Sequence, residues 1–197
     1  MPSKVINKNI LFIHIPKAAG MSICKSLYGD EIGHKRAIDF YRADSEAFNK
    51  LKKFTIVRDP YERLCSAYNF LADGGMNSYY YDKKFSEFIN KFQSFDDFIY
   101  NWLSVGNNKY NYMHFIPQTD FLLINDEISI DKVGKIENLQ SFIDELNTSW
   151  GISLNVSSIN ETKTKIIDKT YILNNDKLRD TIYKLYQKDF ELLKYDR

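Results

Sequence analysis

The sequence has few cysteines, no long apolar run and almost no net charge. Its two cysteines, Cys24 and Cys65, stand in no C-x-x-C or Cys/His pattern, so we expect neither a disulfide framework nor a metal site, and a reducing compartment fits. The apolar run Ile10–Ile15 is far too short to cross a bilayer. A net charge of +1 argues against a general nucleic-acid binder, which needs a basic excess. We therefore expect a cytoplasmic protein without a transmembrane segment or a nucleic-acid partner.

The chain also lacks internal repeats and low-complexity linkers. Its 197 residues have the length of one domain. Hydrophobic residues make up 44% of the chain and charged residues 27%, which is typical of a globular protein with a substantial core. We expect a single domain over residues 1–197.

A strand–turn–helix pattern occurs twice in the first half of the chain. The run NILFIHI (9–15) is typical of a strand buried on both faces, and MSICKSLYG (21–29) predicts a short helix that ends at its glycine. The run KFTIVRDP (53–60) predicts a second buried strand. Asp59 then fits the N-cap of a helix that continues to Gly74. Each of the two turns carries a basic residue.

The remaining elements are less regular, and strands and helices alternate among them. The expected order is a loop over 74–85, a helix over 94–106 capped by Ser94, a strand over 119–124, a short strand over 132–136, a helix that contains Leu139 and Leu146, and a long amphipathic helix over about 176–194. This alternation predicts an α/β fold.

The first turn has the composition of an anion site. Helix N-termini carry free amides and partial positive charge, and the small residues Ala18, Ala19 and Gly20 let an anion approach the backbone closely. Lys17 adds a full charge. The phosphate-loop pattern G-x-x-x-x-G-K-[ST] is absent, and an ordinary tight turn with an exposed lysine remains the alternative.

The second turn carries Arg58, whose guanidinium can grip an anion bidentately. Ser66 lies eight residues further on, about two helical turns away. The alternative is a surface pair of Arg58 with Asp59 or Glu62, beside a neutral helix serine. Two basic turns in one sheet suggest a nucleotide with a diphosphate-like 5′ end and a remote second phosphate.

Two segments carry a family resemblance. IPKAAGMSI and FTIVRDPYERLCSAYNFL resemble the cofactor-binding motifs of carbohydrate O-sulfotransferases that use 3′-phosphoadenosine 5′-phosphosulfate (PAPS), including the heparan sulfate 2-O-sulfotransferases and small bacterial relatives. HFIPQTDFLL, DKVGKIENLQSF and IYKLYQKDFELLKY are also similar to that family, so the resemblance runs from about Asn9 to Tyr195. It implies a three-layer, P-loop-like α/β domain with a central, mostly parallel sheet flanked by helices.

The resemblance also implies roles for single residues. Lys17 would contact the bridging oxygen and the 5′-phosphate of PAPS, and Arg58 and Ser66 would bind its 3′-phosphate. The 5′-phosphosulfate would be held by the hydroxyl of Ser22 and by main-chain amides of Ala18, Ala19, Gly20, Met21, Ser22 and Ile23. Family loops often carry hydroxyl residues where this chain has Ala18 and Met21, so side-chain donors are lost there while the main-chain amides remain.

The sequence has three histidines that could serve as a base. GHKRAIDF resembles the segment that supplies the catalytic histidine of 2-O-sulfotransferases, so His34 is favoured as the base over an exposed loop histidine. His14 lies in a strand, and a core histidine is favoured there over a catalytic one. His114 would line the acceptor cleft or cap a strand. Tyr79, Tyr80 and Tyr81 form either a sugar-stacking loop or a loop packed on itself.

The function we expect is transfer of a sulfuryl group from PAPS to a hydroxyl of an oligosaccharide, polysaccharide or glycolipid. The acceptor hydroxyl would attack sulfur in line while His34 takes its proton, and adenosine 3′,5′-bisphosphate would leave without help from a metal. Two other classes remain open: a P-loop-like nucleotide-dependent kinase, and a nucleotide-binding module without catalysis.

Overall fold

The computed structural model describes residues 5, 8–76, 79–156 and 166–197. By their internal packing, they fall into two compact units, residues 1–58 with 118–160 and residues 59–117 with 161–197. Each unit is described here by itself. The expectation of one domain over the whole chain stays a prediction.

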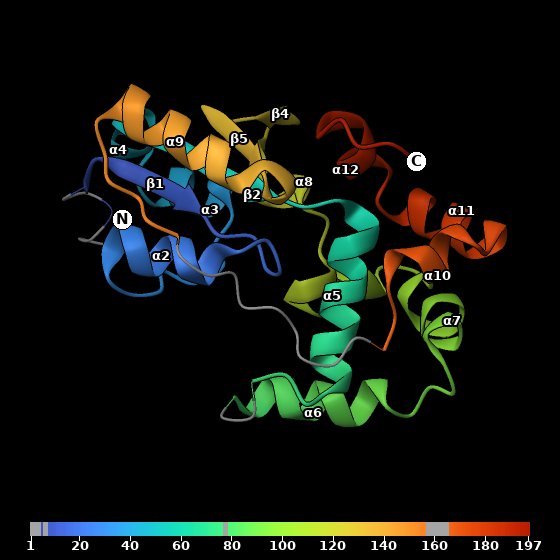
Figure 1. Cartoon of the computed structure of the whole chain (residues 1–197). Helices are drawn as coiled ribbons and strands as arrows, with labels where there is room; N and C mark the ends of the chain where they lie inside the picture. Colours follow the sequence, from blue (N-terminus) through green and yellow to red (C-terminus); the bar gives the residue numbers. More distant parts are fainter. Residues whose placement is uncertain (1–4, 6–7, 77–78, 157–165) are drawn as a thin grey trace. The chain divides into compact units, whose positions relative to one another are not determined.

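The first unit is built on a parallel sheet of three strands. These are β1 (Ile10–Ile13), β2 (Lys52–Val57) and β5 (Lys132–Lys135), in the order β1-β2-β5. Ile13 pairs with Thr55, and Val57 pairs with Lys135. Figure 1 shows the sheet with α9 (Leu139–Trp150) in front, α3 (Ala37–Ala43) and α4 (Ser45–Lys50) behind, and α2 (Gly20–Tyr28) beside β1. The expected α/β fold with a parallel sheet flanked by helices is therefore confirmed.

Side chains of the sheet explain how α9 and β1 are held. A Cβ on Gly134 would lie 2.3 Å from Cδ1 of Phe142, so the glycine lets α9 approach β5 closely. Phe54 of β2 packs against Phe142 and against Trp150 at the end of α9. On the outer edge of β1, the hydroxyl of Tyr28 donates to the Ile10 carbonyl and accepts from the Phe12 amide, both at 2.9 Å.

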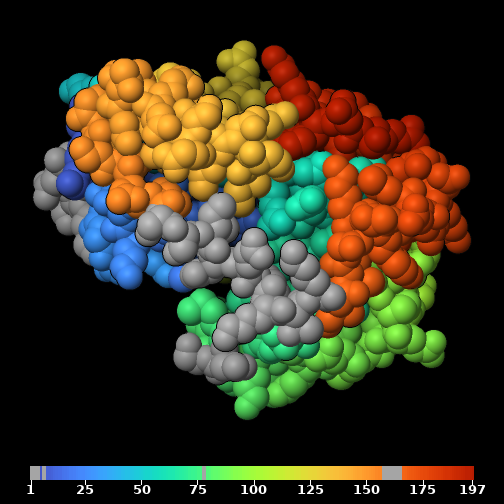
Figure 2. Space-filling view, in the orientation of Figure 1, coloured from blue at the N-terminus to red at the C-terminus, as the bar shows by residue number. Residues whose placement is uncertain are grey.

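The segment that follows α9 returns to α2. The amide of Asn155 donates to Oγ of Ser26 at 2.9 Å. Figure 2 shows the orange surface of the α9 segment next to the blue surface of the α2 segment.

The expected strand over 119–124 is wrong for most of its length. Residues Thr119–Leu122 form the short helix α8, and only β3 (Leu123–Ile124) is extended, paired with β4 (Glu127–Ile128) in a hairpin. A short apolar run has no periodicity that separates a strand from a buried helical turn. The third strand of the sheet is β5, where the sequence predicted a short strand over 132–136.

The described residues of the second unit form helices joined by turns and loops, with no strand among them. It consists of α5 (Pro60–Ala72), α6 (Tyr80–Ile89), α7 (Phe95–Phe98) with a π-helical turn (Ile99–Leu103), 3₁₀ turns at Asn108–Tyr110 and Met113–Phe115, and the helices α10 (Lys169–Leu173), α11 (Asp176–Leu185) and α12 (Gln187–Leu192). Large side chains such as Tyr61, Phe98 and Phe115 are fully buried in its core.

Two expectations for this unit are corrected. The predicted loop over 74–85 is partly helical, because α6 begins at Tyr80. Residues 77 and 78 of this predicted loop lie outside the described residues. The buried face of α6 includes the polar residues Asp82 and Ser86, so its apolar periodicity was hidden. The predicted helix over 176–194 breaks at Tyr186, which leaves helical geometry and donates its hydroxyl to the Phe115 carbonyl at 2.9 Å.

The predicted helix over 94–106 is confirmed in its first part. The Ser94 side chain accepts the Asp97 amide at 3.1 Å, as an N-cap does. The helix then widens into the π-helical turn that ends at Leu103.

Candidate functional site

The carboxyl edge of the parallel sheet collects the basic residues that the sequence singled out. In open parallel sheets, ligands bind outside the carboxyl ends of the strands. Here β1 ends four residues before Lys17, β2 ends one residue before Arg58, and β5 ends at Lys135. The first unit therefore has a candidate anion site at this edge.

The turn between β1 and α2 has an unusual main-chain path. Lys17 (φ 69°) and Ala19 (φ 58°) adopt left-handed conformations on either side of Ala18, which has a negative φ. Such alternation turns successive main-chain amides toward one concave side and makes an anion-binding nest. Ala18 is buried, while Lys17 and Ala19 are half-buried.

The first turn of α2 adds amide donors to this nest. Ala19 is the N-cap, it supplies no capping side chain, and no acidic residue lies in the first turn. The leading amides of a helix have no intrahelical acceptor. Ser22 is half-buried, Met21 points outward and Ile23 lies in the core, so Met21 and Ile23 offer only their main chain. This donor set, with Lys17 beside it, fits a phosphosulfate group.

Gly20 fixes where α2 begins. A Cβ at this position would lie 1.8 Å from Cδ2 of His14 and 2.2 Å from its Nε2. Only glycine lets the helix start directly on the imidazole ring. The His14 ring in turn stacks on Phe12 with a centroid distance of 5.9 Å.

His14 is a core histidine, as the sequence favoured. It is 3% exposed, and its Nδ1 lies 3.8 Å from Sγ of Cys24. Burial, helped by the charge of His34, lowers the pKa of His14 to about 3. Burial also raises the pKa of the Cys24 thiol to about 12. Both groups are therefore neutral around pH 7.

His34 lies against the same strand end. Its Nδ1 is 3.0 Å from the main-chain carbonyl oxygen of His14, and the two imidazole centroids are 4.1 Å apart. The ring is half-buried and so differs from a fully exposed loop histidine. A carbonyl oxygen only accepts, so the Nδ1 of His34 carries a proton and donates. In the neutral ring, Nε2 is then the basic nitrogen.

The main chain of Arg58 is clamped by a residue that sequence reasoning missed. Gln118 is fully buried; its Oε1 accepts the Arg58 amide at 2.9 Å and its Nε2 donates to the Arg58 carbonyl at 2.7 Å. This amide pair extends the hydrogen bonding of β2 by one residue. Gln118 lies within the segment HFIPQTDFLL, but nothing in that segment indicates a contact 60 residues earlier in the chain.

The helix after Arg58 is capped by a carboxylate. Oδ1 of Asp59 accepts the amides of Tyr61 and Glu62 at 3.0 and 3.1 Å, and its Oδ2 accepts Nζ of Lys169 at 2.7 Å. The predicted N-cap is therefore confirmed. Ser66 is half-buried on α5, in the second unit. Its joint action with Arg58 stays a prediction.

The predicted acceptor residues all lie in the second unit. Tyr79, Tyr80 and Tyr81 are 45%, 65% and 63% exposed, at the N-cap and first turn of α6. Tyr81 contacts both of the others at centroid distances of 5.6 Å. They are therefore on the surface and also packed on each other.

Two positions were expected for His114, in the lining of the acceptor cleft or at the cap of a strand, and it does not cap a strand. It lies in a 3₁₀ turn and is 9% exposed. Its ring stacks on Tyr112 at 5.3 Å and packs on Phe70 at 5.4 Å. The hydroxyl of Tyr112 forms a short hydrogen bond with buried Asp82.

Comparison with known proteins gives one result. A family model described as the sulfotransferase family matches residues 6–196. This chain belongs to the sulfotransferase family. The match shows an enzyme family that transfers sulfuryl groups, and it covers both units. Comparisons with curated proteins and with solved structures give no significant match.

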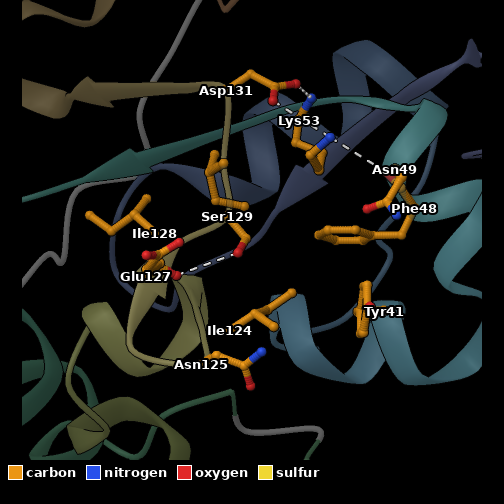
Figure 3. A pocket seen from close by; sticks show the side chains of 11 residues that line it. Tyr41, Phe48, Asn49, Lys53, Ile124, Asn125, Glu127, Ile128, Ser129 and Asp131 are labelled. Atoms are coloured by element: carbon orange, nitrogen blue, oxygen red, sulfur yellow. Dashed lines mark hydrogen bonds and ion pairs between the residues drawn. The ribbon is translucent and has the colours of Figure 1, made fainter.

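One pocket of this sulfotransferase's first unit lies away from the carboxyl edge. It has a volume of about 390 Å³ and includes Tyr41, Phe48 and Lys53 in its lining. Figure 3 shows these side chains with Asp131, which accepts from Lys53 just before β5 begins. Lys53 stands near the start of β2, so the pocket marks the amino edge of the sheet. The candidate anion site, with the first turn of α2 and Lys17, lies at the opposite edge.

Two further properties concern the described residues alone. None of their helices is long and apolar enough to span a membrane. They also contain no cluster of three or more His, Cys, Asp or Glu side chains arranged to hold a metal ion.

Proposed function

We propose that this sulfotransferase uses PAPS as donor and a hydroxyl of a carbohydrate as acceptor. The observation that best supports PAPS as the sulfuryl donor is the start of α2, where the N-cap Ala19 has no capping side chain, the turn is left-handed and Lys17 follows the carboxyl end of β1. The 5′-phosphosulfate of PAPS is an anion, and main-chain amides at a helix N-terminus are typical hydrogen-bond donors to such a group. When bound, PAPS supplies the sulfuryl group and leaves as adenosine 3′,5′-bisphosphate.

The main-chain nest and Lys17 would together bind and stabilise the negative charge of the 5′-phosphosulfate. The amides from Ala18 to Ile23 and the Ser22 hydroxyl would hold the 5′-phosphosulfate, while Nζ of Lys17 would stabilise the negative charge that grows on the leaving phosphate. Charge that grows only in the transition state is what a catalytic cation must recognise. Arg58, clamped by Gln118, would bind the 3′-phosphate with Ser66.

His34 would act as the general base. With its proton held on Nδ1 by the His14 carbonyl, Nε2 would take the proton of the acceptor hydroxyl as the new S–O bond forms and the bond from sulfur to the leaving phosphate breaks. The acceptor would be an oligosaccharide, polysaccharide or glycolipid. The exposed tyrosines 79–81 offer ring faces on which a sugar can stack, with His114 as a further acceptor contact.

The decisive experiment combines binding and transfer. Calorimetry should show that adenosine 3′,5′-bisphosphate binds and that ATP binds far more weakly; the reverse order would favour a kinase. Transfer of ³⁵S-sulfate from labelled PAPS to a glycan panel should then label at least one glycan. Binding of the bisphosphate with no transfer to any glycan would indicate a different acceptor class or a binding module.

The base is tested by replacing each histidine. His34→Ala should reduce kcat by about 10²–10⁴, the usual contribution of general-base catalysis, with little change in bisphosphate binding. His114→Ala is the matched control and should act mainly through the acceptor KM. If His114→Ala abolishes turnover while His34→Ala leaves it intact, His114 is the base.

A further inference from the structure

The outer edge of β1 carries a row of main-chain groups that face away from β2. Tyr28 satisfies the first part of this row, through the Ile10 carbonyl and the Phe12 amide. Further along, the main-chain carbonyl of His14 accepts from Nδ1 of His34 at 3.0 Å. His34 is therefore docked on the strand by a bond that selects which of its two nitrogens carries the proton.

The side chain of His14 contacts both parts of the candidate site. Its ring lies directly under Gly20, where α2 begins, and its centroid lies 4.1 Å from that of His34 at an angle of 50°. Phe12 and Cys24 hold the ring from two other sides. An imidazole enclosed in this way has little freedom, so it can limit the tilt of the His34 ring.

Neutrality of His14 matters for its neighbour. Two imidazolium rings 4.1 Å apart would repel each other strongly. Because burial keeps the pKa of His14 near 3, the His14 ring stays neutral around pH 7 and this repulsion does not arise. The titratable groups packed on the His14 ring in the described contacts are His34 and the neutral thiol of Cys24.

We propose that His14 is a positioning residue for sulfuryl transfer: its carbonyl fixes Nε2 of His34 as the basic nitrogen, and its buried ring sets the orientation of the His34 ring beneath the start of α2. The inference rests on the proposed role of His34 as base. It adds a residue that acts through His34 without touching either substrate.

The carbonyl half of the proposal has a direct spectroscopic test. Long-range ¹H–¹⁵N correlation spectra of the ligand-free protein at about pH 8 should show His34 in its Nδ1–H tautomer, the less common form of a free histidine side chain. Tyr28→Phe removes the other edge contact of β1 and should leave this tautomer unchanged. An Nε2–H tautomer for His34 in the wild-type protein overturns the proposal.

The ring half is tested by a double-mutant cycle. His14→Ala should lower kcat roughly tenfold or more when His34 is present, and less than about twofold in the His34→Ala background, because residues that act as a unit are non-additive. An equal loss in both backgrounds would show that His14 only supports the fold. Bisphosphate binding, measured by calorimetry, reports whether each variant retains the α2 nest.

A conservative variant covers the case in which His14→Ala does not fold. His14→Phe keeps a neutral ring and the main-chain carbonyl, so kcat should stay within roughly threefold of wild type if packing positions His34. A loss with His14→Phe at least as large as with His14→Ala overturns the packing role. If the single variant His34→Ala leaves kcat unchanged, the proposed role of His34 as base is wrong. The tautomer experiment then still tests whether the His14 carbonyl holds the Nδ1 proton of His34.

Discussion

Two helices follow two strands of the same parallel sheet, and they differ in how their N-termini are capped. At the start of α2, the N-cap Ala19 provides no capping side chain and the first turn holds no acidic residue. At the start of α5, Asp59 caps two amides and Glu62 lies in the first turn. Asp59 thus already accepts leading amides of α5, whereas Ala19 offers no side-chain acceptor to those of α2.

The difference assigns separate tasks to the two turns. The first turn can bind an anion through its main chain with help from Lys17. At the second, Asp59 satisfies the leading amides of the helix, so an anion there must rely on side chains, above all on Arg58. The sulfotransferase would therefore bind one phosphate mainly through main-chain amides and the other mainly through the Arg58 side chain. Variants can test each of these sites.

Among the variants of the two turns, removal of the Lys17 charge should have the largest effect. Lys17→Ala should reduce kcat by about 10²–10³, as loss of a single transition-state donor does, and weaken PAPS binding much less. Steady-state kinetics with direct binding by calorimetry separates the two quantities. Lys25→Ala, in the exposed last turn of α2, is the control. An effect on KM alone would make Lys17 a ground-state anchor.

A second variant makes the start of α2 resemble that of α5. Ala19→Asp adds a carboxylate at the N-cap, where it should compete with a bound anion and weaken adenosine 3′,5′-bisphosphate by roughly tenfold or more. In Ala19→Asn the new side chain has the same size as Asp and tolerates the left-handed conformation, but it lacks the charge. Its loss of affinity for the bisphosphate should therefore be several times smaller. Similar affinities for both variants would argue against an anion at this helix end.

Arg58→Ala should act on one phosphate only. Loss of a charge-assisted contact of roughly 1.5–3 kcal/mol should weaken adenosine 3′,5′-bisphosphate by about tenfold or more and leave adenosine 5′-phosphate nearly unchanged. Calorimetry with both nucleotides measures the ratio. Arg58→Lys, which keeps the charge without the fork, should lose less. Equal weakening of the two nucleotides would place Arg58 away from the 3′-phosphate.

At the start of α5 the expected change is in stability. Asp59→Ala removes the cap and the partner of Lys169, so the free energy of unfolding should fall by about 1–2 kcal/mol while kcat changes little. Urea denaturation at pH 7.5 measures it. Asp59→Asn keeps a capping oxygen and should retain most of the stability. A large loss of kcat with normal stability would contradict the purely structural role of this cap.

The smallest effect concerns the neutral histidine under α2. The pKa of His14 is lowered from 6.5 to about 3, so the unfolded chain binds more protons than the folded one between these values, and stability falls as the pH falls through this window. Between pH 7.5 and 6 the loss should be about 0.8 kcal/mol. Urea denaturation at both values should show that His14→Phe loses this part of the pH dependence; an unchanged slope would mean that His14 titrates normally.

Local patterns in the sequence were sufficient for much of the first unit and for the start of α5 in the second. The apolar runs before His14 and Arg58 predicted β1 and β2, and Asp59 predicted the start of α5. These features are decided by neighbours in the chain: buried strand composition, a capping carboxylate, and small residues in a turn. The same patterns pointed to Lys17 and to the start of α2 as an anion site.

Contacts between distant residues decided the rest. Gln118 reaches Arg58 across 60 residues, and Tyr186 leaves its helix to reach the carbonyl of Phe115. The polar buried face of α6, with Asp82, has no apolar period that a sequence can show. The docking of His34 on the His14 carbonyl also appears only in three dimensions, because a hydrogen bond over 20 residues depends on how the chain folds back along the edge of β1. The sequence by itself determined which residues carry charge and where strands turn into helices, while the tertiary structure decided which nitrogen of His34 is basic and what holds Arg58 in place.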